Sequence, residues 1–313
     1  MSAVPAVPAA TTSPAIAFAD AKTVRANELG DVPFLMYHRI VAEPGSVYDR
    51  SPAQFRAELE RLAAEDYVPV TAKEAATGRM DIPAGKHPVV LTFDDGDPSQ
   101  FGLDAAGKPI AGTAVDLLLQ VGVQHPGFRP VASFYVNANP FGGQGGSEPL
   151  EWLRANGFEV GNHTYSHANL AEAGDDLVQR EIADGDQAIV RALPGYRVSS
   201  LALPFGAAPS NPDLARTGAS SGISYEYDCV LLVGAGPSPS PYSAAFDPLN
   251  VPRIRSQDAT GEDARYGSTT WLDELAAHPD RRYTSDGVPD RISYPLSTSV
   301  VLAEEFEGRA FGY

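Results

Sequence analysis

Two groups of side chains in this sequence have the types and spacing to bind and use a metal ion. Two carboxylates, Asp94 and Asp95, stand side by side. Two imidazoles, His163 and His167, lie four residues apart, a spacing that puts both on one face of a helical turn. Two imidazoles and a carboxylate leave the fourth position of a tetrahedral metal open, which is typical of catalytic sites. The pattern therefore favours a catalytic metal site.

Both groups directly follow segments that we expect to be buried strands. Residues 88–93 (PVVLTF) end at Asp94, and residues 158–160 (FEV) precede the histidines. Active sites of α/β barrels form at the carboxyl ends of strands, so the two groups can meet there. Neighbouring side chains on an extended backbone point to opposite sides, but a turn at Gly96 lets both carboxylates face one site. An Asp-Gly pair is also a common surface turn, which is the simpler interpretation of this motif alone.

Strand-like and helix-like segments alternate along most of the chain. Apolar runs predict further strands over residues 32–37, 131–136, 201–203, 229–233 and 250–254. Apolar periodicity predicts helices over residues 111–121, 148–156 and 177–192. This alternation implies parallel strands in a barrel or a doubly wound sheet.

One helix has a clear beginning in the sequence. Ser51 can cap it, Pro52 suits its first position, and Gln54 completes a capping box. Its expected apolar face carries Phe55, Leu59 and Leu62.

Three motifs together resemble the polysaccharide deacetylase (NodB-homology) family. Residues 91–96 (LTFDDG) resemble its first signature and residues 161–167 (GNHTYSH) its second. Residues 203–206 (LPFG) resemble its third, which normally reads Arg-x-Pro-Tyr-Gly. The resemblance spans residues 31 to about 260 and is closest to the permuted poly-N-acetylglucosamine deacetylases. It implies a distorted (β/α) barrel with about seven parallel strands.

The resemblance assigns roles to the first two motifs. Asp95, His163 and His167 correspond to the ligands of one divalent metal, with Zn²⁺ expected and Co²⁺ or Ni²⁺ as alternatives. Asp94 corresponds to the general base.

The third motif matches in part. Pro204, Phe205 and Gly206 correspond to residues of the substrate groove, with the Phe205 N–H holding the oxyanion. The family's arginine, which pairs with the base, is replaced by Ala202. Arg253, at a late strand end, is the candidate substitute, and an exposed surface arginine is the alternative interpretation.

The general acid is expected at the front of the chain. The family usually takes it from a Leu-x-His motif near the C-terminus, which this chain lacks; His278 lies in a polar segment. Residues 35–38 (LMYH) end the first strand with His38, which resembles the acid of the permuted subgroup. A purely structural histidine is the alternative for His38, and His87 is expected at the surface.

These residues imply a hydrolase that removes N-acetyl groups from a polysaccharide or oligosaccharide of N-acetylglucosamine. An O-acetyl esterase of the xylan type would use the same ligands and remains an alternative. A non-catalytic carbohydrate-binding surface protein that retains the fold is a second alternative, favoured by Ala202. A xylose-isomerase-like barrel would need more Glu and Asp ligands at its strand ends.

Composition excludes several partners. The formal net charge of −17 offers no basic field for nucleic acid or an anionic membrane surface. A single cysteine, Cys229, excludes an internal disulfide. No apolar run of 18 or more residues predicts a membrane span.

Three parts of the chain are expected. Residues 1–30 read as a flexible leader rich in Ala and Pro, residues 31–260 as the catalytic domain, and residues 261–313 as an extension packed on the barrel. Such leaders often follow the signal peptide of exported proteins, so we expect a secreted or cell-surface location, although no signal peptide is visible.

Overall fold

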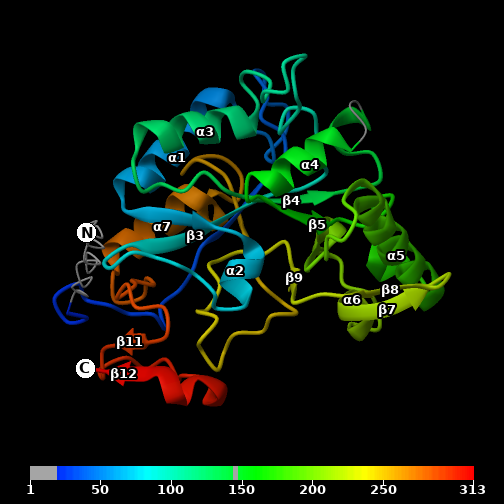
Figure 1. Ribbon diagram of the computed structural model, residues 1–313. Helices are drawn as coiled ribbons and strands as arrows, with labels where there is room; N and C mark the ends of the chain where they lie inside the picture. Colours follow the sequence, from blue (N-terminus) through cyan, green and yellow to red (C-terminus); the bar gives the residue numbers. More distant parts are fainter. Residues whose placement is uncertain (1–19, 144–146) are drawn as a thin grey trace, which may run out of the picture.

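The chain folds around a curled sheet of parallel strands, visible at the centre of Figure 1. The computed structural model describes residues 20–143 and 147–313, and over these ranges the sheet has the order β10-β1-β3-β4-β5-β6-β9, with β2 beside β3. Every pairing in it is parallel. The strands are β1 (Phe34–Tyr37), β2 (Tyr67–Val70), β3 (His87–Phe93), β4 (Ser133–Val136), β5 (Glu159–Asn162), β6 (Ser200–Ala202), β9 (Cys229–Leu231) and β10 (Ile254–Arg255). The distorted (β/α) barrel with about seven parallel strands is therefore confirmed.

The two edges of the sheet meet on residues 251–255. Val251 forms a parallel bridge with Leu231 of β9, and Ile254 of β10 pairs with Leu35 of β1. Arg253 lies between these two contacts and is completely buried. The segment therefore brings this arginine into the barrel, beside the end of β3.

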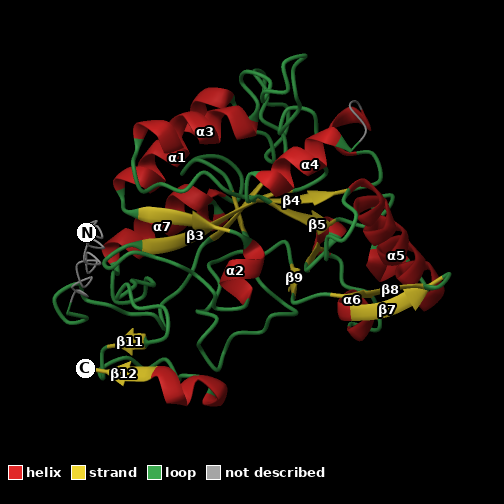
Figure 2. Ribbon diagram, in the orientation of Figure 1, coloured by secondary structure: helices red, strands yellow, loops and turns green. Residues whose placement is uncertain are grey.

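Helices cover the sheet, as Figure 2 shows. Their bounds are α1 (Pro52–Ala64), α2 (Ala72–Ala76), α3 (Ala114–Gln124), α4 (Glu148–Ala155), α5 (Asp175–Ala192), α6 (Asp213–Arg216) and α7 (Ser268–Ala277). In the view of Figure 1, α1, α3 and α4 lie above the sheet and α5 lies at its right. The predicted helices over residues 111–121, 148–156 and 177–192 correspond to α3, α4 and α5.

Helix α1 begins as its sequence predicts. The Ser51 hydroxyl accepts a hydrogen bond from the Gln54 N–H, and the Gln54 side chain accepts one from the Ser51 N–H. Pro52 occupies the first turn. The predicted apolar face is confirmed, because Phe55, Leu59 and Leu62 are all buried in the core with residues of the sheet.

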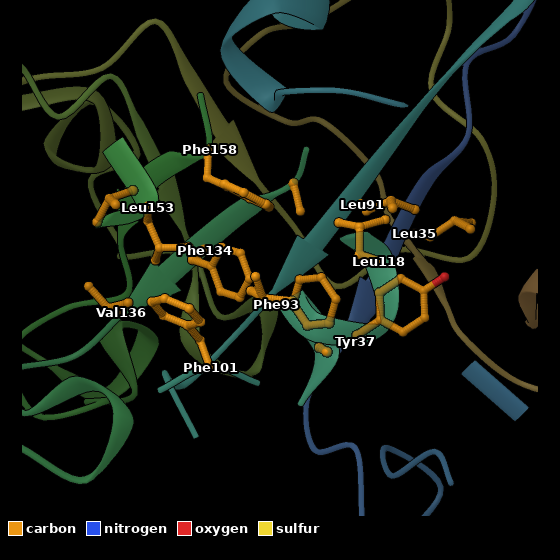
Figure 3. Packing of buried hydrophobic residues seen from close by; sticks show 14 of the residues in the cluster. Leu35, Tyr37, Leu91, Phe93, Phe101, Leu118, Phe134, Val136, Leu153 and Phe158 are labelled. Atoms are coloured by element: carbon orange, nitrogen blue, oxygen red, sulfur yellow. The ribbon is translucent and has the colours of Figure 1, made fainter. Parts of the chain in front are cut away.

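The alternation of side chains along the strands separates the core from the site. Phe93 of β3 stacks on Phe134 of β4 and on Tyr37 of β1, with ring centroids 4.9 and 5.1 Å apart. Figure 3 shows these rings packed with side chains from α3 and α4. The next residue along, Asp94, points to the opposite side because successive strand residues alternate. The apolar packing of Phe93 therefore directs the Asp94 carboxylate into the barrel.

Five strands were not predicted as strands. β2 contains Pro69, which argues against a central strand and is tolerated because β2 pairs with β3 alone. β7 (Thr217–Ser220) and β8 (Ile223–Glu226) form an antiparallel hairpin beside α5. β11 (Ile292–Tyr294) and β12 (Ala310–Gly312) pair in parallel below the barrel in Figure 1.

Residues 20–30 differ from the flexible leader that we expected. Leu29 is buried, and the Glu28 N–H donates to the Ser293 carbonyl at 2.8 Å. The Tyr313 hydroxyl donates to the Ala26 carbonyl at 2.9 Å. These residues are ordered because the C-terminal segment supplies partners that are distant in sequence. The remaining residues of the expected leader, 1–19, lie outside the described residues.

His87 is buried and not at the surface as predicted. Its Nδ1 lies 2.7 Å from the Tyr283 carbonyl oxygen, and its ring packs edge-on against Tyr67. The C-terminal segment covers it, a contact across nearly 200 residues that sequence context could not indicate.

In the described part of the chain, no helix is long and apolar enough to span a membrane.

Candidate active site

The structure brings Asp95, His163 and His167 together at the carboxyl ends of β3 and β5. Asp95 Oδ1 lies 3.4 Å from the Nε2 atom of each histidine. Each of the three residues offers one ligand atom, and these three atoms all lie within 4.8 Å of one another. The two motifs are therefore neighbours in space although about 70 residues separate them in the chain.

The chemistry of this donor set fits a divalent metal. Zn²⁺ binds imidazole nitrogen and carboxylate oxygen at about 2.0–2.2 Å, and tetrahedral geometry places two such donors roughly 3.4 Å apart. Both Asp95–histidine separations match that spacing. The Asp95 and His167 side chains are partly exposed, at 41% and 32%, so a ligand can reach the site from solvent.

The histidines do not lie on a helical turn, which corrects the sequence-based expectation. Residues 163–169 form a loop in which Thr164 and His167 have positive φ angles of 63° and 61°. This conformation brings the two imidazoles edge to face, with centroids 4.9 Å apart. The helical argument for the four-residue spacing does not apply here, although the two imidazoles do lie together.

Positive φ angles recur at the site. Of the nine non-glycine residues with positive φ in the described chain, four belong to its motifs: Asp95, Thr164, His167 and Phe205. Such backbone conformations cost free energy and persist where the surrounding structure imposes them, often at active sites.

Hydrogen bonds fix the orientation of His163. Its Nδ1 lies 2.8 Å from the Ala202 carbonyl oxygen, which can only accept, so Nδ1 carries the proton. The lone pair of Nε2 is then free for a metal, and this arrangement is typical of metal-binding histidines.

Two residues that the sequence did not single out hold residues 163–169, the histidine loop. Asn137 donates to the carbonyls of His163 and Thr164 at 2.6 and 3.0 Å. Glu181 of α5 accepts from the N–H and the hydroxyl of Ser166, both at 2.9 Å. Asn137 directly follows β4, so the strand-end argument could have indicated it. Glu181 is a charged residue on the buried face of an amphipathic helix, and this unusual position could have indicated it from the sequence.

Asp94 forms a buried ion pair with Arg253. Arg253 Nη1 and Nη2 lie 2.6 and 2.7 Å from the two Asp94 oxygens, in the bidentate geometry of an arginine–carboxylate pair. Burial alone would raise the pKa of Asp94, but the Arg253 guanidinium outweighs it and holds that pKa well below its usual range. Asp94 is therefore ionised, and its Oδ2 lies 4.0 Å from His163 Nε2. The exposed-arginine interpretation of Arg253 is wrong, since the residue is completely buried.

His38 follows β1 on the same end of the barrel. Burial lowers the pKa of His38, and the charges of Asp94 and Asp95 oppose that shift. Its ring packs beside Tyr48 at 5.0 Å. His38 therefore lies near enough to Asp94 and Asp95 for their charges to act on its imidazole.

The third motif lies against the histidine loop. Pro204, Phe205 and Gly206 form a 3-10 turn after β6, and Phe205 has a positive φ of 59°. Phe205 is 65% exposed, and its ring meets the His167 ring edge to face with centroids 4.5 Å apart. An apolar surface thus borders the exposed side of the histidine loop.

Comparisons with known proteins agree with this fold. The family model for polysaccharide deacetylase matches residues 81–223 of this chain. A Bacillus cereus peptidoglycan-N-acetylglucosamine deacetylase is 26% identical over 162 residues, covering 51% of each chain. A Sinorhizobium fredii chitooligosaccharide deacetylase is 29% identical over 141 residues, covering 44% of this chain and 55% of the relative. The chain thus spans about half the length of these curated relatives.

A solved structure shares the fold over a longer range. The Streptococcus pyogenes deacetylase PplD, in complex with acetate, superposes with a TM-score of 0.55 at 20% identity. The match covers 72% of this chain and 92% of that one. It supports the barrel as the framework of the site.

Proposed function

We propose that this chain is a metal-dependent hydrolase that removes N-acetyl groups from a glycan containing N-acetylglucosamine. The observation that carries the proposal is the Asp95–His163–His167 donor set beside Asp94, a buried carboxylate that Arg253 keeps ionised. A donor set that leaves a coordination position open, with an ionised carboxylate next to it, suits attack by water on a carbonyl group.

The residues of the first two motifs divide the work of the reaction. Asp95, His163 and His167 would hold a divalent metal, which would supply Lewis acidity and make a nearby water more acidic. Asp94 then accepts a proton as water attacks the acetyl carbon. Arg253 holds the Asp94 carboxylate in place through two hydrogen bonds.

The third motif and His38 complete the proposal. The Phe205 N–H stabilises the negative charge that develops on the carbonyl oxygen, and Pro204 and Gly206 shape the surface beside it. His38 protonates the departing nitrogen, because an amine leaves poorly without a proton. Since burial lowers the pKa of His38, this imidazole must take up a proton during the cycle before it can donate one.

We propose Zn²⁺ as the metal, with Co²⁺ and Ni²⁺ as alternatives. Two neutral imidazoles and one carboxylate suit Zn²⁺, which forms tetrahedral sites with nitrogen and oxygen ligands. Imidazole is also a good ligand for neighbouring transition metals.

The proposed substrate class follows from the relatives and from His38. Both curated relatives are named for glycans built with N-acetylglucosamine. A histidine at the end of β1 is the feature that this chain shares with the permuted poly-N-acetylglucosamine type. Such substrates also suggest a secreted or cell-surface location, with residues 31–260 as the catalytic domain and residues 261–313 as an extension on it.

One observation bears on the alternative of a non-catalytic carbohydrate-binding protein. That hypothesis was favoured by Ala202, which leaves the third motif without its arginine. Arg253 pairs with Asp94 from a different strand, so the base is not left without a cation. The support for the binding protein is therefore weaker than the sequence suggested.

A substrate panel with and without a chelator tests the proposal. Acetate should be released from N-acetylglucosamine oligomers, chelation should abolish the release, and added Zn²⁺ should restore it. Faster release from acetylated xylan than from these amides would favour the O-acetyl esterase. Glycan binding that survives chelation, without acetate release beforehand, would favour the carbohydrate-binding protein.

A further inference from the structure

The main chain around Asp94 and His38 lies beyond the last pairing of their strands. The ladder between β1 and β3 ends with the hydrogen bond from the Asp94 N–H to the Tyr37 carbonyl, at 3.0 Å. Asp95 has a φ of 75°, so the chain leaves the strand direction immediately afterwards. The sheet thus holds Asp94 through its N–H, but among the described residues no main-chain group bonds the His38 carbonyl.

Gln100 joins the two residues at this point. Its side-chain nitrogen lies 2.8 Å from the His38 carbonyl oxygen and 2.5 Å from the Asp94 carbonyl oxygen. Both partners can only accept, so the nitrogen and not the oxygen of the carboxamide must face them. A carboxamide has two N–H groups, one for each carbonyl. This one completely buried side chain thus connects the main chains of His38 and Asp94.

Ser99 holds the other side of His38. Its hydroxyl accepts a hydrogen bond from the Ile40 N–H at 3.0 Å. Ser99 and Gln100 therefore bind the main chain at Ile40 and His38. They supply hydrogen bonds that a neighbouring strand would otherwise provide.

The residues that hold His38 are themselves anchored in the core. The carbonyls of Ser99 and Gln100 each accept a hydrogen bond of 3.1 Å from the first turn of α3. Phe101 follows directly, is fully buried and packs edge-on against Phe141 with centroids 5.5 Å apart. Figure 3 shows Phe101 and Phe134 in the same cluster of buried side chains. The position of the segment is thus set by core packing.

Within the part of the chain that the structure describes, the buried His38 Nδ1 has no hydrogen-bond partner. The imidazole is therefore oriented through its main chain and its packing on Tyr48, and not by a bond to the ring.

We propose that Ser99 and Gln100 are positioning residues that set the location of the proton donor His38 relative to the base Asp94. The proposal rests on the proposed function, because it requires His38 to protonate the leaving amine. Proton transfer depends steeply on distance, and a displacement of about 1 Å can cost roughly 10²-fold in rate.

The test compares an amide with an ester whose leaving group needs no proton. Ser99→Ala removes only the contact beside His38, so kcat on an N-acetylglucosamine oligomer should fall by about 10-fold, with a change below about 3-fold on nitrophenyl acetate. Gln100→Met removes both donors, so it should lower kcat on the amide by about 10²-fold and on the ester by less. Ser99→Thr, which keeps the hydroxyl, should restore amide turnover. Metal content is measured for each variant.

Ser240→Ala is the matched control. Ser240 is completely buried and its hydroxyl accepts from the Tyr242 N–H at 3.2 Å, near the opposite end of the barrel. Its removal should leave the ratio of amide to ester turnover unchanged.

Two kinetic results would overturn the positioning role. One is amide turnover within about twofold of wild type in both Ser99→Ala and Gln100→Met; the other is an equal loss on both substrates. Crystal structures of the variants with an unchanged His38–Asp94 separation would also contradict it. An inactive wild-type protein would refute the proposed function itself, a result distinct from an active wild type with unaffected variants.

Discussion

At the scale of single residues, the site depends on a carboxylate that is buried and paired with a buried cation. Asp94 and Arg253 are both buried, and each satisfies the other through two hydrogen bonds. Arg253→Met would leave the Asp94 carboxylate buried without its cation, which typically costs about 3–5 kcal/mol of unfolding free energy. Denaturant unfolding measures this loss.

The exposed pair of Arg197 and Asp228 provides the control for that prediction. Arg197→Met should cost less than about 1 kcal/mol, because exposed ion pairs contribute little. A similar loss of unfolding free energy in both variants would contradict the prediction that the buried Asp94–Arg253 pair matters more than an exposed one.

His38 is the second residue whose role can be isolated. His38→Ala should lower amide turnover by about 10²-fold or more, as expected for loss of a general acid, with a milder effect on nitrophenyl acetate. The ratio of kcat values on the two substrates measures this difference. Equal losses on both would argue that His38 is structural.

At the scale of elements, helix α5 sets the position of the histidine loop, residues 163–169. A Cβ added at Gly185 would lie 2.4 Å from Asn162 Oδ1, which accepts from the Thr164 N–H in that loop. Gly185→Ala should therefore cost about 1–3 kcal/mol through overpacking. It should also weaken metal affinity by about 10-fold or more, because it moves groups that orient the ligands.

Metal titration and thermal unfolding test this prediction together. At Gly308 an added Cβ meets nothing within 4 Å, so Gly308→Ala is the matched control and should leave metal affinity unchanged. Unaltered metal affinity in Gly185→Ala would contradict the proposed link between α5 and the loop.

The elements also show what the sequence could predict. The apolar runs, the helix signals and the capping box at Ser51 depend on local interactions, and they correspond closely to the observed strands and to α1. The pairing of Arg253 with Asp94 joins residues about 160 positions apart, so local pattern could only nominate that arginine. The histidine loop differs from expectation because side chains of Asn137 and Glu181 impose a conformation that its own sequence does not indicate.

At the scale of the whole molecule, the C-terminal segment covers the amino end of the barrel and buries His87. Burial lowers the pKa of His87 to about 4, while the unfolded chain keeps the usual value near 6.5. Between these two values the unfolded state binds the extra proton. Stability is therefore lost as pH falls from about 6.5 through 4, by up to about 3 kcal/mol.

His87→Asn isolates this effect, since an asparagine amide can still donate toward the Tyr283 carbonyl but does not titrate. Unfolding free energies at pH 7.5 and 4.5 should differ by about 2–3 kcal/mol more in the wild type than in the variant. Parallel pH profiles for the two proteins would contradict the buried, neutral histidine.

The central claim is that Asp94 acts as the base beside a metal held by Asp95, His163 and His167. Its most direct measurement is acetate release from N-acetylglucosamine oligomers by wild type and Asp94→Asn at equal, measured metal content. Asp94→Asn should keep the metal and lose at least about 10²-fold in kcat, because the water then lacks a proton acceptor. A metal-loaded Asp94→Asn protein that turns over at the wild-type rate would contradict the claim.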